Sequence, residues 1–281
     1  MVNCDGIIYD KETAFLDHNN RGLRYGDALF ETMRSLGGRL VFWEDHYLRL
    51  MSSMRILRME IPMDFTMEFL ETQVRRVLEA NVLEDETARI RLSVYRQPGG
   101  RYLPDSREVS WIIEAESLEA PFYIAGETPY EIELFKDFYV NDDFLSTLKT
   151  NNKILQVVGS IFCSENGYAN CLLLNQRKTV VEALNANLFL VEGNNLRTPP
   201  LTDGCLNGII RKKLIGMVNK LEGYTLEERS ISPFELQKAD ELFITNSILG
   251  IRSITRYRKA EYKSEVAKDL LGKLNALARL G

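Results

Sequence analysis

The chain has 281 residues, a formal net charge of −5 and an apolar fraction of 45%. This length suits one large domain or two smaller ones, each with a sizeable core. The acidic balance argues against nucleic acid or an anionic membrane as the main partner.

The first 117 residues predict a small α/β domain. Two short strands are expected in GIIYD and ETAFLD, and a hairpin in LFETMRSLGGRLVF that turns at Gly37-Gly38. Apolar residues at helical spacing predict helices in FWEDHYLRLMSSMRILRM and MEFLETQVRRVLEANVL. Further strands are expected in ARIRLSVYRQ and VSWIIEAES, on either side of a turn-rich segment. Residues 118–128 contain a proline and a glycine between strands and are the predicted interdomain linker.

Residues 129–281 predict a larger domain. A strand is expected in YEIELFKDFYV, followed by an extended segment around Lys149 and a helix that runs through IFCSE. Strands and turns follow in NCLLLNQ, KTVVEALNANLFLVEG and NNLRTPP, and then a helix from about Leu206 to Leu221. The strand ADELFITNS and the amphipathic helix EVAKDLLGKLNALARL complete an α/β chain of two unequal lobes.

Several site classes are disfavoured by residue usage. The four cysteines are scattered without a CxxC motif, which predicts reduced thiols and no zinc or disulfide framework. No apolar run reaches membrane-spanning length and MVNCDGIIYD does not resemble a signal peptide, so a cytoplasmic protein is expected. With only His18 and His46, metal hydrolases and Ser/Cys–His nucleophiles lose weight, and no metal site is expected. An enzyme would then move protons with a lysine, tyrosine or carboxylate.

Polar residues interrupt predicted buried structure at several places. Glu182 lies in an apolar run, where a carboxylate needs a partner, although a solvent-facing position at a strand edge would also explain it. His46 and Arg49 are one helical turn apart, which a solvated helix face would explain equally well. The turn at Asn207-Gly208 opens a helix whose N–H groups can bind an anion.

These residues together match the needs of one cofactor. Pyridoxal phosphate requires a lysine for a Schiff base, a glutamate for the pyridine nitrogen, and an arginine with a helix N-terminus for the phosphate. The motifs that carry these residues resemble those of the class IV aminotransferases, in the same order along nearly the whole chain. They are RYGDALFETMR, DHYLRL, LKTNNKILQ, VVEALNANLFLV, LNGIIRKKL and ELFITNSILGI.

The resemblance implies a two-domain fold of type IV, α/β with α+β lobes and similar to D-amino acid aminotransferases, and a homodimer. It implies that Lys149 binds the aldehyde of pyridoxal 5'-phosphate and moves the substrate's proton. It implies that Glu182 pairs with the pyridine nitrogen. The phosphate would be bound by a set of side-chain and main-chain donors, namely Arg49, the N–H groups of Ile209 and Ile210, and Ser247.

Within the family, the motifs most resemble 4-amino-4-deoxychorismate lyases, which release 4-aminobenzoate and pyruvate for folate synthesis. The resemblance gives Thr32 a catalytic part, and Asn152 and the asparagine of TNSILGI also look lyase-like. A branched-chain or D-amino acid aminotransferase stays open, as does a non-catalytic protein, and Arg252 departs from both enzyme patterns. A solvated hairpin tip would also explain the arginines of RQPGGR. The substrate-binding residues implied are Arg34, Arg96, Arg101 and Asn246.

Overall fold

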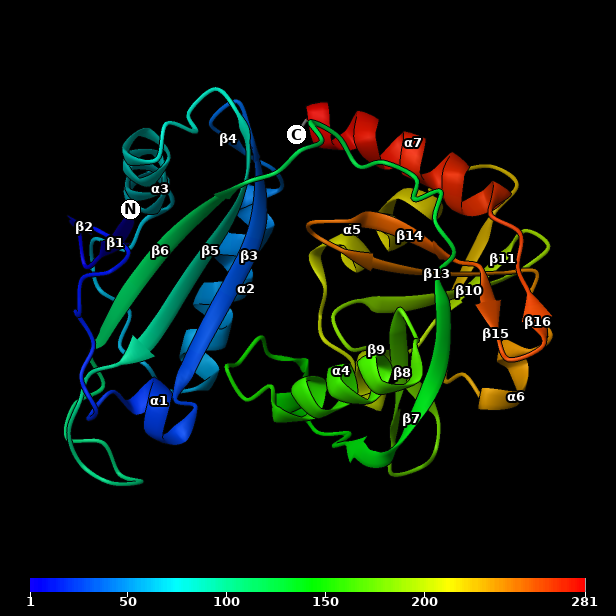
Figure 1. Cartoon of the computed structure of the whole chain (residues 1–281), viewed down its shortest axis with the longest axis horizontal. Helices are drawn as coiled ribbons and strands as arrows, with labels where there is room; N and C mark the ends of the chain where they lie inside the picture. Colours follow the sequence, from blue (N-terminus) through cyan, green and yellow to red (C-terminus); the bar gives the residue numbers. More distant parts are fainter. Residues whose placement is uncertain (281) are drawn as a thin grey trace. The chain divides into compact units, whose positions relative to one another are not determined.

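The computed structural model describes residues 1–280, which form two compact units (Figure 1). Unit 1 contains Met1–Pro121 together with the short segment Lys149–Asn152. Unit 2 contains Phe122–Leu148 and Lys153–Leu280. The sequence predicted two domains that simply follow one another, so the return of Lys149–Asn152 to unit 1 was not foreseen.

Unit 1 is built on a six-stranded antiparallel sheet in the order β2-β1-β6-β5-β3-β4. Its strands are β1 (Val2–Cys4), β2 (Ile7–Tyr9), β3 (Ala28–Leu36), β4 (Arg39–Leu40), β5 (Thr87–Arg96) and β6 (Val109–Ser117). The predicted hairpin between β3 and β4 is present. Its turn residues Gly37 and Gly38 have φ angles of 52° and 76°, a region that glycine enters without a steric penalty.

One face of this sheet is covered by helices α2 (Trp43–Ile56) and α3 (Met67–Ala80), and a short helix α1 (Arg21–Tyr25) precedes β3 (Figure 1). Side chains alternate between the two faces of a strand, so every second residue of β3 and β5 points at these helices. The covered face is mainly apolar, and its central side chains Met33, Ile90 and Leu92 are completely buried.

Unit 2 contains two five-stranded sheets, in the orders β12-β11-β10-β13-β14 and β16-β15-β7-β8-β9. The strands are β7 (Glu131–Val140), β8 (Asn170–Asn175), β9 (Val180–Ala183), β10 (Asn187–Glu192), β11 (Asn195–Thr198), β12 (Thr225–Glu228), β13 (Glu241–Asn246), β14 (Gly250–Ile254), β15 (Arg256–Tyr257) and β16 (Ala260–Glu261). Apolar side chains of both sheets, among them Leu134 and Leu172 of one and Leu188 and Leu242 of the other, form a common core.

The helices of unit 2 cover the sheets. They are α4 (Ile154–Asn166), α5 (Ile209–Val218), α6 (Pro233–Leu236) and α7 (Glu265–Leu280), with the short 3-10 helices η1 (Phe144–Thr147) and η2 (Leu201–Asp203). Helix α4 packs on β7 and β8, whereas α5 and α7 pack on β13, and α7 also packs on β14. Gly167 ends α4 in the left-handed conformation with φ of 73°, a common glycine stop for helices.

The α/β fold class predicted from the sequence is confirmed, with both central helices of unit 1 and the C-terminal helix at their expected places. One prediction is wrong: ETAFLD (residues 12–17) is irregular rather than a strand. In the sheet of unit 1, β2 pairs with β1 alone, and residues 12–17 do not add a further strand to its open edge. No helix among residues 1–280 is long and apolar enough to span a membrane.

Candidate active site

Lys149 lies in a short extended segment of unit 1 that pairs with the start of β3. The N–H of Phe30 donates to the carbonyl of Lys149 at 2.9 Å, and the N–H of Asn151 donates to the carbonyl of Ala28 at 3.0 Å. The Nζ of Lys149 lies 4.4 Å from the centre of the Phe30 ring, whose negative face attracts an ammonium. The lysine is thus fixed over β3 at half-buried depth.

Arg49 is bound to a buried carboxylate of β3. Glu31 is 1% exposed and accepts from the Nε of Arg49 at 2.8 Å and from its Nη2 at 2.5 Å. His46, one turn earlier on α2, places its Nδ1 2.7 Å from the same carboxylate. His46 is 0% exposed, so the alternative that His46 and Arg49 lie on a solvated helix face is wrong.

Glu31, His46 and Arg49 form a buried trio, and their charges follow from burial and from the contacts between them. Burial alone would raise the pKa of Glu31, but the Arg49 cation and the hydrogen bonds from His46 and Arg49 outweigh it and hold the pKa at about 2. Burial lowers the pKa of His46, and the cations of Arg49 and Lys149 add to this against the opposing effect of Glu31. His46 is therefore neutral at pH 7, and because a carboxylate only accepts, its Nδ1 carries the proton.

The sheet face of unit 1 opposite to the helices carries a second group of polar side chains. Phe30, Thr32 and Arg34 alternate onto this face of β3, and Arg91 of β5 is the register partner of Thr32. The Arg91 guanidinium lies 3.9 Å from the centre of the Phe30 ring, and its Nε is 4.0 Å from Glu114. The Phe30 ring and the half-buried Arg91 thus lie side by side, with Thr32 opposite Arg91 in register, and planar carboxylate groups suit such a guanidinium.

The predicted substrate arginines have different surroundings. Arg34 is 6% exposed and donates to the carbonyl of Ala120 at 2.7 Å. Arg96 is also 6% exposed. Its guanidinium donates to Asp27 at 2.9 Å and to two main-chain carbonyls at 3.1 and 2.8 Å. The contacts of Arg96 hold loops of unit 1 together. Arg101 is exposed, as the hairpin-tip alternative predicted.

Glu182 is a buried carboxylate of unit 2. It lies on β9, is 9% exposed, and its Oε2 accepts from the N–H of Leu206 at 2.9 Å and from the Nδ2 of Asn187 at 3.5 Å. The alternative of a solvent-facing glutamate at a strand edge is therefore wrong. The same Asn187 amide donates to the carbonyl of Leu206 at 2.8 Å, so it ties Glu182 to the turn that precedes α5.

The start of α5 has the features of an anion site. Its N-cap is Gly208, which offers no side chain to cap the first N–H groups, those of Ile209 and Ile210 among them. A Cβ at Gly208 would lie 2.0 Å from the Oδ1 of Asn187, so only glycine fits here without displacing that side chain. The predicted donors thus adjoin the Glu182 turn, within unit 2.

Two further groups respond to the charge of Glu182. Burial lowers the pKa of Lys153, which precedes α4, and the Glu182 carboxylate opposes that effect. Burial raises the pKa of the Cys205 thiol to about 12, and Glu182 acts in the same direction. Both groups thus lie close to Glu182 in a largely dry environment.

The turn after β13 holds the remaining predicted residues. The Asn246 Oδ1 accepts from the N–H groups of Ile248 at 3.0 Å and Leu249 at 2.8 Å, which closes the turn. Ser247 is half-buried, and its carbonyl accepts from the Tyr123 hydroxyl at 3.2 Å. Arg252, the departure from the family pattern, donates to the hydroxyl and carbonyl of Thr128, both at 2.8 Å.

Sequence reasoning missed four residues around the candidate sites of unit 1 and unit 2. Glu31 and Asn187 lie inside motifs that were recognised, so their motif positions were an available signal. Arg91 is the cross-strand partner of Thr32, a relation that needs the register of β3 and β5. Lys153 lies four positions after Lys149, but its closeness to Glu182 depends on the fold of unit 2.

Comparisons with known proteins identify the family of this chain. Residues 28–257 match the family described as amino-transferase class IV. Over 266 residues the chain is 27% identical to an aminodeoxychorismate lyase of Vibrio harveyi, covering 91% of this chain and 94% of that one. Over 266 residues it is 25% identical to a D-alanine aminotransferase of Listeria monocytogenes, covering 90% and 86%.

The fold is also similar to that of solved enzymes. A branched-chain aminotransferase of Thermoproteus uzoniensis superposes with a TM-score of 0.86 at 26% identity, covering 99% of this chain and 94% of that one. The predicted fold of the type IV aminotransferases is thereby confirmed. The chain belongs to the class IV aminotransferase family and is a pyridoxal-phosphate-dependent aminotransferase or lyase.

Proposed function

We propose that this protein is a 4-amino-4-deoxychorismate lyase, which uses pyridoxal 5'-phosphate to release 4-aminobenzoate and pyruvate for folate synthesis. The proposal assigns Lys149 to the cofactor's aldehyde and Glu182 to its pyridine nitrogen. It assigns the phosphate to Arg49, the N–H groups of Ile209 and Ile210, and Ser247.

The residues of unit 2 fit the pyridine ring and the phosphate. Glu182 is 9% exposed and its Oε2 accepts from two N–H groups, and such donors favour the carboxylate form that a protonated ring nitrogen requires of its partner. Gly208 leaves the first turn of α5 open, and its N–H groups and dipole favour an anion such as a phosphate. Asn187 couples the two sites by bonding both Glu182 and the Leu206 carbonyl.

The residues of unit 1 fit the same group. Glu31 holds Arg49 in a two-point contact, so the arginine reaches a phosphate in a fixed orientation rather than as a mobile side chain. The amine of Lys149 rests over the Phe30 ring on the same side of the unit's sheet as Thr32. Neutral His46 supports Glu31 without adding a charge.

The chemistry then depends on how these residues handle protons. When bound, pyridoxal phosphate supplies an aldehyde that takes the substrate's amine and a ring that withdraws electrons from the neighbouring carbon. Lys149 takes the proton from the carbon that bears the amine. Glu182 keeps the pyridine nitrogen protonated. Thr32, on the same sheet face as the Lys149 amine, is assigned to proton transfer near the leaving enolpyruvyl group.

The exposed sheet face of unit 1 is the observation that favours the lyase. The substrate of the lyase is a ring with two carboxylates. This sheet face offers the Phe30 ring beside Arg91, with Thr32 opposite Arg91 in register. Guanidinium groups bind carboxylates in two-point contacts. We assign Arg91, Arg34 and Arg101 to the carboxylates. Arg96 and Asn246, whose polar atoms already hold loops, are assigned to positioning those loops.

An aminotransferase is the alternative, since a D-alanine aminotransferase and a branched-chain aminotransferase are also similar to this chain. The test is a discontinuous assay of cofactor-loaded protein with 4-amino-4-deoxychorismate, with Lys149→Ala as control. The lyase predicts 4-aminobenzoate and pyruvate in equal amounts, absent from the control. Amino transfer to 2-oxoglutarate without 4-aminobenzoate would refute the lyase and establish the alternative.

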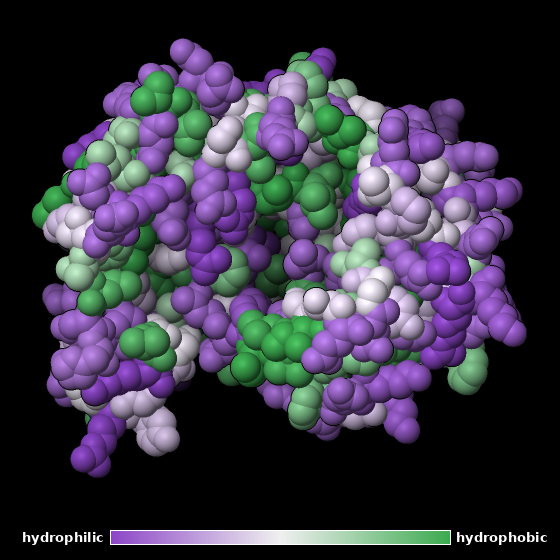
Figure 2. Space-filling model, in the orientation of Figure 1, coloured by the Kyte–Doolittle hydropathy of each residue, from purple (hydrophilic) through white to green (hydrophobic). Residues whose placement is uncertain are grey.

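We also propose that the protein is a homodimer. The end of β7 and the helix η1 expose four large apolar side chains, Phe138, Tyr139, Phe144 and Leu145, at 42% to 66% of their surface. Apolar patches that contact water in this way favour contact with another chain. On the face drawn in Figure 2, apolar residues gather in patches on a mainly polar surface. Light scattering should give the mass of two chains, and Phe144→Glu should give the mass of one; a single-chain mass for the unaltered protein would refute the dimer.

A further inference from the structure

Two thiols lie in contact in the core beneath helix α4. Cys163 of α4 and Cys171 of β8 are 5% and 0% exposed, and their Sγ atoms are 2.6 Å apart. They belong to the apolar cluster that packs α4 on its sheet. Neither sulfur belongs to the groups assigned above to the cofactor or the substrate, so the proposed activity does not account for the contact between them.

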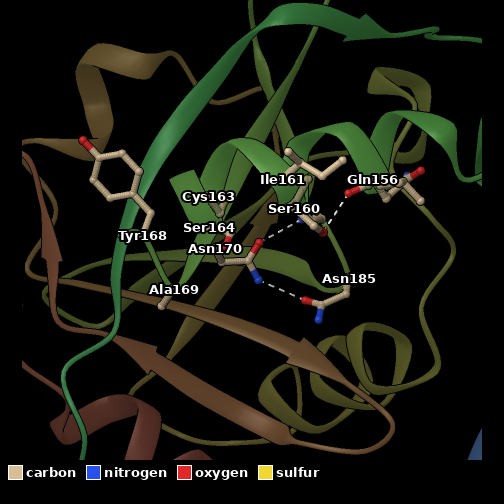
Figure 3. A pocket seen from close by; sticks show the side chains of 11 residues that line it. Gln156, Ser160, Ile161, Cys163, Ser164, Tyr168, Ala169, Asn170 and Asn185 are labelled. Carbon is tan, nitrogen blue, oxygen red and sulfur yellow. Dashed lines mark hydrogen bonds between the residues drawn. The ribbon is translucent and has the colours of Figure 1, made fainter. Parts of the chain in front are cut away.

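The two thiols differ in access. Cys163 lines a cavity of about 610 Å³ beside α4, together with Ser160, Asn170 and Asn185 (Figure 3). Asn170 donates to Asn185 at 3.0 Å at this cavity. Cys171 is not among the residues that line it. A small reagent that enters the cavity therefore meets Cys163 before Cys171.

The two thiols also differ in acidity. The hydrogen bond between the two thiols lowers the pKa of Cys163, although burial opposes it, and the same contact raises the pKa of Cys171. Burial raises the pKa of Cys4 and raises that of Cys205 to about 12. Cys163 is thus the one cysteine of the four whose pKa is lowered. The thiolate is the nucleophilic form of cysteine, so Cys163 is the first to react.

We propose that Cys163 and Cys171 form a reversible oxidation site for hydrogen peroxide or a similarly small hydroperoxide. The Cys163 thiolate attacks one peroxide oxygen, the O–O bond breaks, and Cys163 becomes a sulfenic acid while hydroxide leaves and takes up a proton to form water. The Cys171 sulfur then displaces the hydroxyl group as a second water and forms the disulfide. Two thiols and one peroxide give one disulfide and two waters, and the peroxide is the species reduced.

The site goes beyond the proposed activity because it needs no bound cofactor. The second step needs little motion, since the two sulfurs are already in contact. The product would join α4 to β8, whose Leu173 is the register partner of Glu182. Dithiol reductants would reverse the reaction by thiol–disulfide exchange.

The test exposes the native full-length protein to hydrogen peroxide, quenches it, and counts thiols after denaturation. The four free cysteines should fall to two, the intact mass should drop by two hydrogens, and peptide mapping should join the Cys163 and Cys171 peptides. Dithiothreitol should restore all four. A disulfide that includes Cys4 or Cys205, or four thiols that persist, would overturn the proposal.

Matched variants separate the two steps. Cys171→Ser should stop at a sulfenic acid on Cys163 that dimedone traps, and Cys163→Ser should keep its remaining thiols over the same interval. Cys4→Ser is the control and should still lose two thiols. Equal loss of thiols from Cys163→Ser and the unaltered protein would overturn the order of reaction. The peptide map of the unaltered protein decides the proposal even if a variant does not fold.

Discussion

Replacing Glu31 by glutamine tests the buried trio of unit 1. The substitution keeps the shape of the side chain but removes the charge that compensates Arg49, whose side chain is 10% exposed. Breaking one side of a buried ion pair costs about 3–5 kcal/mol. The pKa of Glu31 gives an independent figure, because the difference between 4.5 and about 2 corresponds to about 3 kcal/mol of stability. We expect Glu31→Gln to lower the free energy of unfolding by about 3 kcal/mol.

The pH dependence of this loss has a defined sign. The pKa of Glu31 is lower in the folded protein than its ordinary value of 4.5, so its stabilisation is complete above that value. It is lost as the pH falls from 4.5 towards about 2, where the folded carboxylate also protonates. The difference in stability between the unaltered protein and Glu31→Gln should therefore be constant from neutral pH to about 5 and should shrink below it.

The assay is urea unfolding followed by tryptophan fluorescence. Both tryptophans, Trp43 and Trp111, belong to unit 1 and are buried, so the signal reports the unfolding of this unit alone. The control is Glu116→Gln, which removes a 58% exposed partner of Arg89 and should cost at most about 1 kcal/mol. If Glu31→Gln costs no more than this control, or if its cost does not change at acid pH, the reasoning about the trio is wrong.

Two other substitutions test the sites of each unit. Arg91→Gln should raise the KM for the dicarboxylate about 10-fold to 100-fold, which is the value of one charge-assisted contact. Arg89→Gln, on the same sheet face, is the control and should leave the KM unchanged. Equal KM values for the two variants would refute the role of Arg91. Gly208→Ala should weaken cofactor binding in equilibrium dialysis at least about 10-fold, because the new Cβ would lie 2.0 Å from Asn187. Gly216→Ala is its control on the same helix, since that Cβ meets nothing within 4 Å. Equal cofactor affinities of the two variants would refute the phosphate site at the start of α5.

Motifs singled out the candidate site residues, whereas the surroundings of these residues could not be predicted from motifs. Glu182 and Arg49 were chosen as site residues because a family pattern carries them, and the alternatives of solvated positions could not be decided locally. Burial decides them: Glu182 is 9% exposed, and Arg49 is locked to Glu31. That pairing connects β3 with α2, and neither the partner nor the buried face follows from spacing within one element.

The other contacts that the sequence did not predict have the same physical origin. The segment of Lys149 pairs with Phe30 and Ala28, which are distant in the chain, and local periodicity contains no information on such pairing. The sequence of the glycine-rich loop likewise could not predict that the guanidinium of Arg96 binds Asp27, which lies in another part of the chain. Local patterns found the long strands and helices, because each buries a regular apolar face.

The most direct test of the account is borohydride reduction of the cofactor-loaded protein, followed by peptide mapping. The account predicts that the cofactor becomes irreversibly attached to the peptide that contains Lys149, and that Lys149→Ala carries no label there. Lys153, four positions further on and near Glu182, is the natural rival. Label on Lys153 or on any other lysine would contradict the assignment of Lys149.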